Sequence, residues 1–292
     1  MAIAIRPLQP FGGEVGGVDL GETSLPETIA AIEAGLDRHA LLVFHDQFIS
    51  DEQQVVFTAN FGPLLKENNK MTRAEDRRLD AAFADVSNLD KGARLRSRDD
   101  KSRMSSLANR LWHSDGAFRV VPAKYSFLSG RAVPPSGGNT EIADMRAAYD
   151  ALDAAMKAEV ADLVCEHSLM TPRLELGFTQ FTAEERASFA PVRQPLVRVH
   201  PVTGRKSLFL SAHAGGIVGW PVPEAKAFLR DLTEHATQPA FVCVHRWRAG
   251  DLIVWDNRQT MHRVRRFDDL TQVRDMRRTT VICDGPLAVQ AA

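Results

Sequence analysis

The residues best suited to chemistry in this chain lie in Leu111-Trp112-His113-Ser114-Asp115. On an extended strand, side chains alternate between two faces, so His113 and Asp115 would point to the same face. A third candidate ligand, His262, follows far downstream in the segment 255–263. Two histidines and one carboxylate make the facial triad typical of non-haem Fe(II) oxygenases, which leaves coordination positions of the metal open. The spacing predicts a metal site formed by His113, Asp115 and His262.

Two arginines at a spacing of four, Arg274 and Arg278, follow His262. On a strand both would point to one face. The planar guanidinium group binds a carboxylate through paired hydrogen bonds and keeps its charge at any working pH. The pair therefore predicts two anions bound in one pocket, one a cosubstrate and the other a substrate.

The bulk properties indicate a globular protein. The chain has 292 residues, 44% of them hydrophobic and 25% charged, which favours one β-rich domain over 1–292. Its net charge of −1 argues against nucleic-acid and membrane partners, despite the arginines at 263–266. The N-terminus lacks the apolar core of a signal peptide, and no apolar run approaches the roughly 20 residues of a membrane span. A cytoplasmic location is expected.

The cysteines favour the same compartment. Cys165, Cys243 and Cys283 are odd in number and scattered, which argues against a disulfide framework and against a zinc-thiolate site. A reducing compartment is consistent with this pattern and suits an enzyme that must keep iron ferrous.

Periodicity, turns and caps predict many strands interrupted by a few helices. Capping boxes at 24–27 and 50–53 begin two helices, of which the first reaches about His39 and the second ends at Gly62-Pro63. Further helices are predicted at 144–163, 182–189 and 223–236, and strands at 40–44, 111–115, 125–133, 139–143, 195–200, 207–212, 241–247, 252–256 and 277–282. This order predicts a mostly β (α+β) fold with a jelly-roll (double-stranded β-helix) core and helical insertions.

The segment 64–108 differs from the rest because its periodicity fades and charges of both signs crowd together. It is either a solvated loop or a lid over the active site, since long loops in compact domains tend to be functional or disordered. We interpret it as a lid. Lys70 in this segment is either a contact for the substrate anion or a solvated charge.

Taken together, these motifs resemble the taurine dioxygenase and chlorophenoxyacetate dioxygenase family of Fe(II)/2-oxoglutarate enzymes. The similar segments are 111–115, the turn 133–140, the strand 250–257, His262 and the arginine pair, and they span nearly the whole chain. Within the family the chain is most similar to the 2,4-dichlorophenoxyacetate dioxygenases, through 145–152 and 235–247. One departure is the loop 268–273, which is one residue longer than expected, so the assignment of the arginines rests on their spacing.

The resemblance implies a role for each group of site residues. The iron ligands would be His113, Asp115 and His262; Arg274 and Thr140 would bind the distal carboxylate of 2-oxoglutarate; Arg278 and Asn109 would contact the substrate. His200, His213 and His245 lie on or beside predicted core strands, and each either lines the pocket or is structural. Trp112 and Trp255 are predicted to pack in the core.

The implied reaction uses Fe(II), 2-oxoglutarate and O2 to hydroxylate the α-carbon of an aryloxyalkanoate such as 2,4-dichlorophenoxyacetate. The product would break down to a phenol and a 2-oxo acid such as glyoxylate, beside succinate and CO2. A sulfonate or alkyl sulfate such as taurine is the alternative substrate. A non-catalytic or hydrolytic metal-binding jelly roll is the alternative class, and 2-oxoglutarate-dependent O2 uptake would distinguish it. Family members are commonly dimers or larger, so a homo-oligomer is expected.

Overall fold

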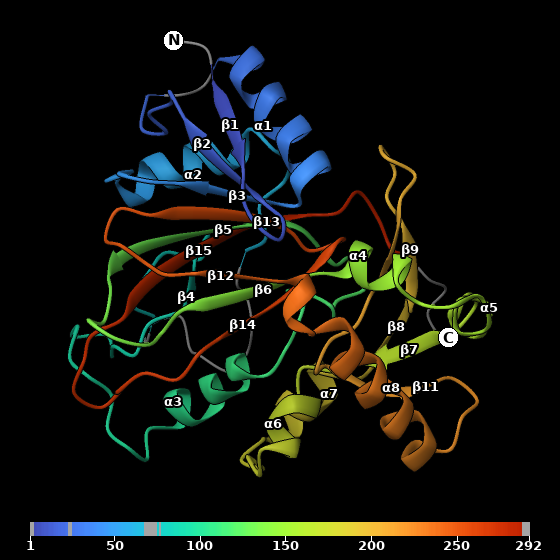
Figure 1. The fold of residues 1–292 in the computed structure, drawn as a ribbon. Helices are drawn as coiled ribbons and strands as arrows, with labels where there is room; N and C mark the ends of the chain where they lie inside the picture. Colours follow the sequence, from blue (N-terminus) through green and yellow to red (C-terminus); the bar gives the residue numbers. More distant parts are fainter. Residues whose placement is uncertain (1–2, 23–24, 67–74, 76, 288–292) are drawn as a thin grey trace.

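The computed structural model describes residues 3–22, 25–66, 75 and 77–287. Within these residues the largest sheet has seven strands, and its pairs are antiparallel except for β2 with β3 (Figure 1). In spatial order the strands are β1 (Ala4–Pro7), β2 (Gly13–Gly16), β3 (Leu41–Phe44), β13 (Leu252–Asp256), β5 (Ala123–Ala132), β15 (Asp275–Ile282) and β4 (Ala84–Asp85).

A second antiparallel sheet, in the order β12 (Val242–His245), β6 (Thr140–Asp144) and β14 (Thr260–Val264), packs against one face of the first. Ile142 and Cys243 from this sheet share a buried apolar cluster with Trp255 and Met276 from the larger one. The functional residues discussed below come largely from these two sheets and from the segments that adjoin them.

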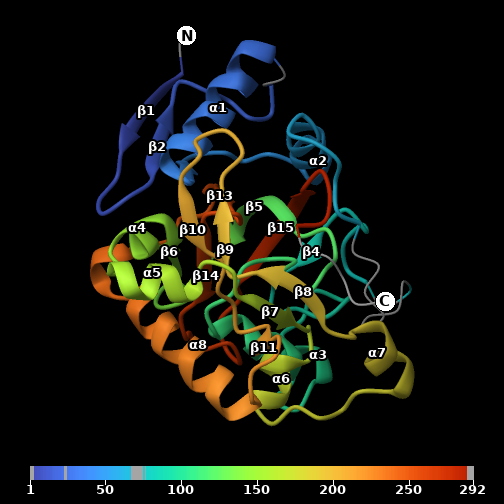
Figure 2. The same cartoon turned by 90° about the vertical axis from the view of Figure 1, so that its right-hand side faces the viewer.

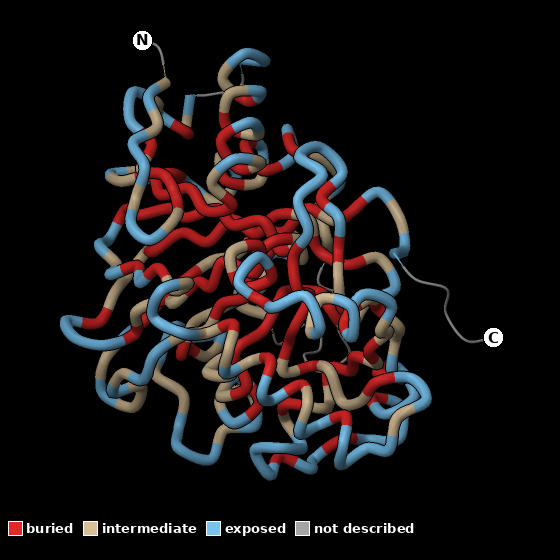
Figure 3. The backbone as a smooth tube through the Cα atoms, turned by 45° about the vertical axis from the view of Figure 1, so that its right-hand side comes forward, coloured by how far each residue is buried: buried red, intermediate tan, exposed pale blue. Residues whose placement is uncertain are grey.

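The other face of the large sheet is covered by α1 (Pro26–His39) and α2 (Asp51–Ala59). Strand β3 is apolar at every position because Leu42 and Phe44 face these helices while Leu41 and Val43 face the second sheet. Figure 3 shows the resulting band of buried strands at the centre of the molecule. The capping box predicted at 50–53 is confirmed; that predicted at 24–27 includes Ser24, which lies outside the described residues.

A third region packs on the end of the small sheet, around a separate apolar cluster. It contains the antiparallel sheet β11 (Ala214–Ile217), β7 (Val164–His167) and β8 (Val192–Pro195), the ribbon of β9 (Val197–Val199) and β10 (Lys206–Leu208), the helices α6 (Thr171–Glu175), α7 (Ala183–Ser188) and α8 (Val222–Ala236), and the 3-10 helix Pro239–Phe241 (Figure 2). The helices expected at 182–189 and 223–236 are confirmed as α7 and α8. None of the helices in the described part of the chain is both long and apolar enough to cross a bilayer.

The single helix expected over 144–163 is wrong, because the segment forms α4 (Met145–Asp150) and α5 (Ala154–Val160). The Asp153 carboxylate accepts a hydrogen bond from the backbone N–H of Met156 at 2.8 Å, which caps a new helix at that point. The apolar stripe that suggested one helix faces the same core from both pieces.

Two further expectations need correction. The segment 111–115 is not a strand: His113 forms an isolated bridge with His262, and a turn follows. The segment 64–108 has more regular structure than expected, since its described part contains β4, α3 (Lys101–Ser106) and the start of the 3-10 helix η2 (Leu107–Arg110). The Asp100 carboxylate caps α3 by accepting from the N–H of Arg103 at 2.8 Å.

Candidate active site

The predicted metal ligands come together where the small sheet meets the turn after residue 113. One potential ligand atom from each of His113, Asp115 and His262 lies within 4.8 Å of the other two, and all three residues are buried. His113 and His262 exchange backbone hydrogen bonds of 2.9 and 2.8 Å, which hold their rings with centroids 4.2 Å apart. The bridge, and not a strand, therefore sets the spacing of the two imidazoles.

Asp115 turns back toward the two histidines because the chain bends directly after it. Gly116 has a φ of +64°, and a Cβ there would lie 2.9 Å from the backbone nitrogen of Ala123. The Asp115 carboxylate accepts from the Ser126 hydroxyl at 2.7 Å, and the Asp115 N–H donates to the Asn257 side chain at 3.0 Å. Strand β5 and the turn directly after β13 thus fix Asp115 through contacts outside the triad.

The ionisation of the triad fits a divalent metal. Burial lowers the pKa of both His113 and His262, so their imidazoles are neutral at pH 7. Burial alone would raise the pKa of the Asp115 carboxyl, but Arg278 and the two histidines outweigh it and lower that pKa to about 2. The His113 Nδ1–H donates to the carbonyl of Leu111 at 2.8 Å, which leaves Nε2 as the ligand atom. Two neutral nitrogens and one ionised oxygen fit Fe(II).

Arg274 and Arg278 line one small cavity of about 30 Å³ together with His113, His262 and Thr140. Arg274 directly precedes β15 and Arg278 lies on it, with a bulge between them at Asp275 and Met276. The two guanidinium groups predicted to share a pocket do so, although the strand between them is irregular.

Arg274 is buried without a counter-charge in the described part of the chain. Its guanidinium donates to the carbonyls of Gly138 and Val86 at 3.2 and 3.4 Å, and no ion pair with a described carboxylate forms. Gly138 is needed there because a Cβ would meet the Arg274 side chain at 3.3 Å and φ is +66°. Burial lowers the pKa of Arg274 to about 10, so it remains a cation at pH 7. A buried cation of this kind is stabilised by a bound anion.

Arg278 differs from the expectation in one respect, because its guanidinium forms a short ion pair with the carboxylate of Asp115. Thr140 lies at the start of β6, and its hydroxyl oxygen accepts a hydrogen bond from the indole N–H of Trp247 at 2.9 Å. Asn109 lies in η2 and lines the cavity as well. Lys70 lies outside the described residues.

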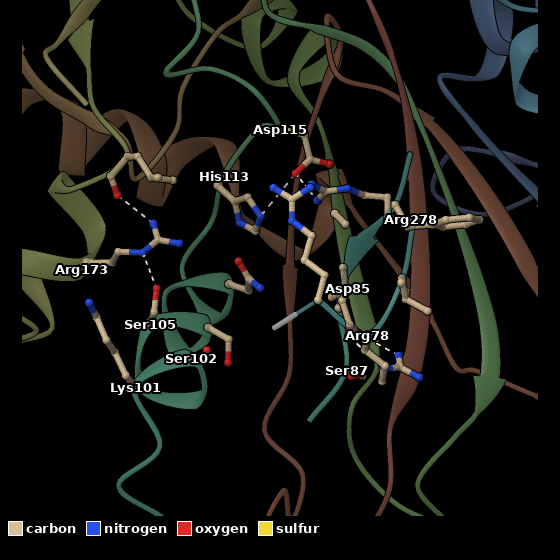
Figure 4. Close-up of a pocket in the computed structure, with 18 of the residues that line it drawn as sticks. Arg78, Asp85, Ser87, Lys101, Ser102, Ser105, His113, Asp115, Arg173 and Arg278 are labelled. Atoms are coloured by element: carbon tan, nitrogen blue, oxygen red, sulfur yellow. Dashed lines mark hydrogen bonds and ion pairs between the residues drawn. The ribbon is translucent and has the colours of Figure 1, made fainter. Parts of the chain in front are cut away.

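A larger cavity of about 250 Å³ opens beside the metal ligands and is lined by His113, Asp115, Asn109 and Arg278. We call it the main cavity. Figure 4 shows His113, Asp115 and Arg278 together, with Arg173, Ser105 and Lys101 along another side. Cations prevail in its lining, which also includes Arg77, Arg78, Arg96, Lys101 and Arg173. Such a cavity suits an organic anion.

The main cavity is also lined by Arg173, His213 and Phe118. Of these three, only His213 was considered as a possible pocket residue from the sequence. Arg173 lies on α6 and donates to the Ser105 hydroxyl at 2.8 Å and to the Leu169 carbonyl at 2.7 Å; burial lowers its pKa to about 10. The His213 ring lies 6.0 Å from that of His113 and 4.8 Å from that of Phe118.

Neither of the other two histidines left open lines the main cavity. His200 contacts Asp256 at 3.2 Å, and His245 contacts Asp251 at 3.1 Å, both away from the lining of the main cavity. Trp255 and Trp112 are buried in the apolar clusters, as expected, although Trp255 also donates to Asn257 at 3.0 Å.

Comparisons with known proteins show the family to which this chain belongs. The sequence model of the protein family described as "Taurine catabolism dioxygenase TauD, TfdA family" matches residues 4–280 of this chain. An alpha-ketoglutarate-dependent 2,4-dichlorophenoxyacetate dioxygenase of Cupriavidus pinatubonensis is 42% identical, with 98% of this chain and 99% of that protein covered. An (S)-phenoxypropionate/alpha-ketoglutarate dioxygenase of Sphingobium herbicidovorans is 38% identical, with 94% and 93% covered.

A solved structure, that of AAD-2 in complex with Mn(II) and N-oxalylglycine, is also similar. It is 55% identical, covers 99% of this chain and 100% of its own, and superposes with a TM-score of 0.96. The chain therefore belongs to the TauD/TfdA family of dioxygenases. It is an enzyme of the Fe(II)- and 2-oxoglutarate-dependent class, which confirms the class and the cofactors expected from the sequence.

Proposed function

We propose that this enzyme hydroxylates the α-carbon of an aryloxyalkanoate such as 2,4-dichlorophenoxyacetate. The α-hydroxy ether is a hemiacetal, so its C–O bond breaks to give a phenol and a 2-oxo acid such as glyoxylate. The observation that carries the proposal is the pair Arg274 and Arg278 in one cavity beside the triad, which provides for two carboxylates. The similarity to 2,4-dichlorophenoxyacetate and (S)-phenoxypropionate dioxygenases supports this substrate class.

In this proposal His113, Asp115 and His262 hold the iron. When bound, Fe(II) with 2-oxoglutarate and O2 supplies the oxidant for the C–H bond, while 2-oxoglutarate becomes succinate and CO2. The Ser126 hydroxyl and the Asn257 side chain keep the Asp115 carboxylate oriented toward the histidines. Neutral imidazoles and an ionised carboxylate leave no proton to displace before the metal binds.

Arg274 and Thr140 bind the distal carboxylate of 2-oxoglutarate. Arg274 supplies the buried positive charge that no described carboxylate neutralises. Because an indole N–H can only donate, Trp247 occupies an acceptor site of the Thr140 oxygen and leaves the hydroxyl proton available for the ligand. Trp247 is thus a positioning residue for Thr140, which sequence reasoning missed.

A Trp247→Phe variant should raise the KM for 2-oxoglutarate about two- to tenfold, which corresponds to the loss of one ordinary hydrogen bond. The KM for the aryloxyalkanoate should stay unchanged, because Trp247 does not line the main cavity. Steady-state O2 uptake with each compound varied in turn measures both constants. Trp220→Phe, at a partly buried tryptophan packed on Phe228, is the matched control; equal changes in both variants would contradict the role of Trp247.

Arg278 holds the substrate carboxylate. A guanidinium has five N–H donors, so Arg278 can keep its contact with Asp115 and still offer donors to the substrate. Anchoring the carboxylate beside the metal brings the adjacent α-carbon, and not the aromatic ring, toward the oxidant. Asn109 and Lys70 are further substrate contacts in this proposal.

An Arg278→Gln variant should mainly raise the KM for the aryloxyalkanoate, by roughly 30-fold or more for a charged contact worth about 2–4 kcal/mol. The KM for 2-oxoglutarate should change much less. Arg173→Gln is the informative comparison, because Arg173 is another buried cation of the main cavity. A larger rise of the substrate KM in Arg173→Gln than in Arg278→Gln would move the anion site to Arg173.

We also propose that 64–108 is a lid within one catalytic domain spanning 1–292. The support is that Asp85, Ser87, Arg96, Lys101 and Ser105, all from this segment, line the main cavity. Limited proteolysis with and without substrate tests the lid, since ordering by substrate should protect the segment.

Three broader expectations remain proposals. The large, mostly antiparallel sheet and the antiparallel sheet β12-β6-β14 that faces it are consistent with a jelly-roll (double-stranded β-helix) core. Free, buried cysteines are consistent with the cytoplasm. A homo-oligomer, a dimer or larger, is expected from the family resemblance, and sedimentation equilibrium tests it.

The experiment for the activity is anaerobic loading with Fe(II), followed by addition of O2 and 2-oxoglutarate with one candidate substrate. The candidates are 2,4-dichlorophenoxyacetate, phenoxyacetate, both enantiomers of 2-phenoxypropionate, and taurine. Equal amounts of succinate and phenol are expected from at least one aryloxyalkanoate. Substrate-dependent succinate with taurine alone would contradict the aryloxyalkanoate assignment and favour the sulfonate alternative.

A further inference from the structure

A second large cavity, of about 650 Å³, contains an excess of positive charge. Four arginines line it, Arg98, Arg103, Arg110 and Arg266, and we call it the arginine cavity. Its lining includes two carboxylates, Asp268 and Asp269, which leaves two formal positive charges uncompensated within it. Arg98 and Arg266 are exposed, so this charge is presented at the surface.

The inner part of the arginine cavity has one carboxylate for two guanidinium groups. Asp269 contacts Arg103 at 3.0 Å and Arg110 at 3.7 Å. Burial lowers the pKa of Arg110, and although Asp269 opposes this, the charges of Arg103 and Arg266 add to the lowering. A bound anion would relieve the repulsion among these arginines.

The arginine cavity adjoins two smaller cavities that lie toward the metal site, since neighbouring cavities share lining residues. One of about 60 Å³ shares Arg103, Arg110 and Asp269 with it, and is also lined by Asn109 and Arg274. Asn109 and Arg274 in turn line the 30 Å³ cavity that contains the metal-binding histidines. Arginines therefore line each stage from the surface to the position proposed for the distal carboxylate of 2-oxoglutarate.

We propose that this series of cavities is an entry and exit route for dicarboxylates, 2-oxoglutarate inward and succinate outward. Its mouth is separate from the main cavity that receives the aryloxyalkanoate, although the 60 Å³ cavity also shares Asp85, Ser87 and Asn109 with the main cavity. The inference rests on the proposed function, in which Arg274 binds 2-oxoglutarate. An aryloxyalkanoate held by Arg278 in the main cavity would lie across the path from that side. A second route lets the two anions reach the iron without passing each other.

The charges along the route suit passage as well as attraction. Exposed arginines raise the local concentration of a dianion and its association rate. The Asp269 carboxylate competes with a passing anion for the guanidinium groups of Arg103 and Arg110. The anion is therefore bound weakly at these two arginines and can move on to the next. Arg274, which has no such competitor among the described carboxylates, is the end of the route.

A pair of charge reversals tests the route. Arg266→Glu changes the mouth of the arginine cavity, and Arg77→Glu makes the same change in the lining of the main cavity. Fe(II)-loaded protein is mixed rapidly and anaerobically with 2-oxoglutarate, and the growth of the metal-to-ligand absorption band gives the association rate constant. Arg98→Glu is a second variant at the same mouth, should Arg266→Glu fail to fold.

Arg266→Glu should lower the association rate constant for 2-oxoglutarate by about tenfold at low ionic strength, with the effect shrinking as salt is added. Arg77→Glu should leave that constant within about twofold of the wild type, because steering acts at the mouth that the ligand uses. Prior saturation of the wild type with aryloxyalkanoate should likewise leave 2-oxoglutarate association nearly unchanged.

Two outcomes count against the route in different ways. If Arg77→Glu slows 2-oxoglutarate as much as Arg266→Glu does, or if bound aryloxyalkanoate blocks its association, the route is wrong while the proposed function stands. If the Fe(II)-loaded wild type gives no absorption band with 2-oxoglutarate, the proposed cosubstrate site fails, and the route fails with it.

Discussion

A His113→Ala variant should fold but lose Fe(II) binding and turnover. Two ligands would remain, Asp115 and His262, and removal of the third takes away a nitrogen whose orientation is fixed by the Leu111 carbonyl. Loss of metal removes the whole reaction, so kcat should fall by several orders of magnitude. Metal analysis after dialysis and O2 uptake with 2-oxoglutarate measure the two effects.

The control is His235→Ala, which removes a histidine on α8 whose ring hydrogen-bonds to the Ala148 carbonyl and lies beside the Phe241 ring. This variant should bind one Fe(II) per chain as the wild type does. Circular dichroism of both variants shows whether the fold is retained. Undiminished turnover by folded His113→Ala would remove His113 from the proposed triad.

An Arg274→Gln variant should raise the KM for 2-oxoglutarate by roughly 30- to 900-fold, which corresponds to the loss of a buried charged contact of about 2–4 kcal/mol. The KM for the aryloxyalkanoate should change far less. In the wild type, 2-oxoglutarate should also raise the melting temperature of the metal-loaded protein, because it binds the native state. Arg274→Gln should lose most of this rise, which differential scanning calorimetry detects.

Arg274→Lys is the matched variant, since it keeps the charge but not the planar pair of donors, and its KM should lie between those of the wild type and Arg274→Gln. If Arg274→Gln raises the substrate KM and Arg278→Gln raises the 2-oxoglutarate KM, the two arginines have been assigned to the wrong carboxylates.

The sequence predicted elements whose causes are local. The Ser50 capping box and the amphipathic pattern of α8 depend on residues within a few positions of each other, and both appear as expected. The split between α4 and α5 also has a local cause, the Asp153 cap, but the continuous apolar stripe concealed it. Patterns of hydrophobicity report burial, and two short helices can bury one stripe.

Contacts between distant segments could not be predicted in the same way. Arg173 reaches the main cavity from α6 and stands near no recognisable motif. Trp247 ends the segment 235–247 that carries part of the family resemblance, but nothing in that segment indicated its contact with Thr140. The triad was predicted because two histidines and a carboxylate suit Fe(II) and because the arginine pair and the family motifs accompany them. The support of the triad was not predicted: a bridge and a turn hold His113 and Asp115 where a strand was expected.

The reciprocal backbone hydrogen bonds between His113 and His262 also make metal binding stabilise the contact between two distant segments of the chain. The two residues belong to segments far apart in the chain, and an ion held by both imidazoles would act as a cross-link across the gap that these two bonds span. Amide hydrogen exchange at these positions should then report metal occupancy. Loading should slow exchange of both backbone protons together, while protons on α1, on the far face of the large sheet, keep their rates.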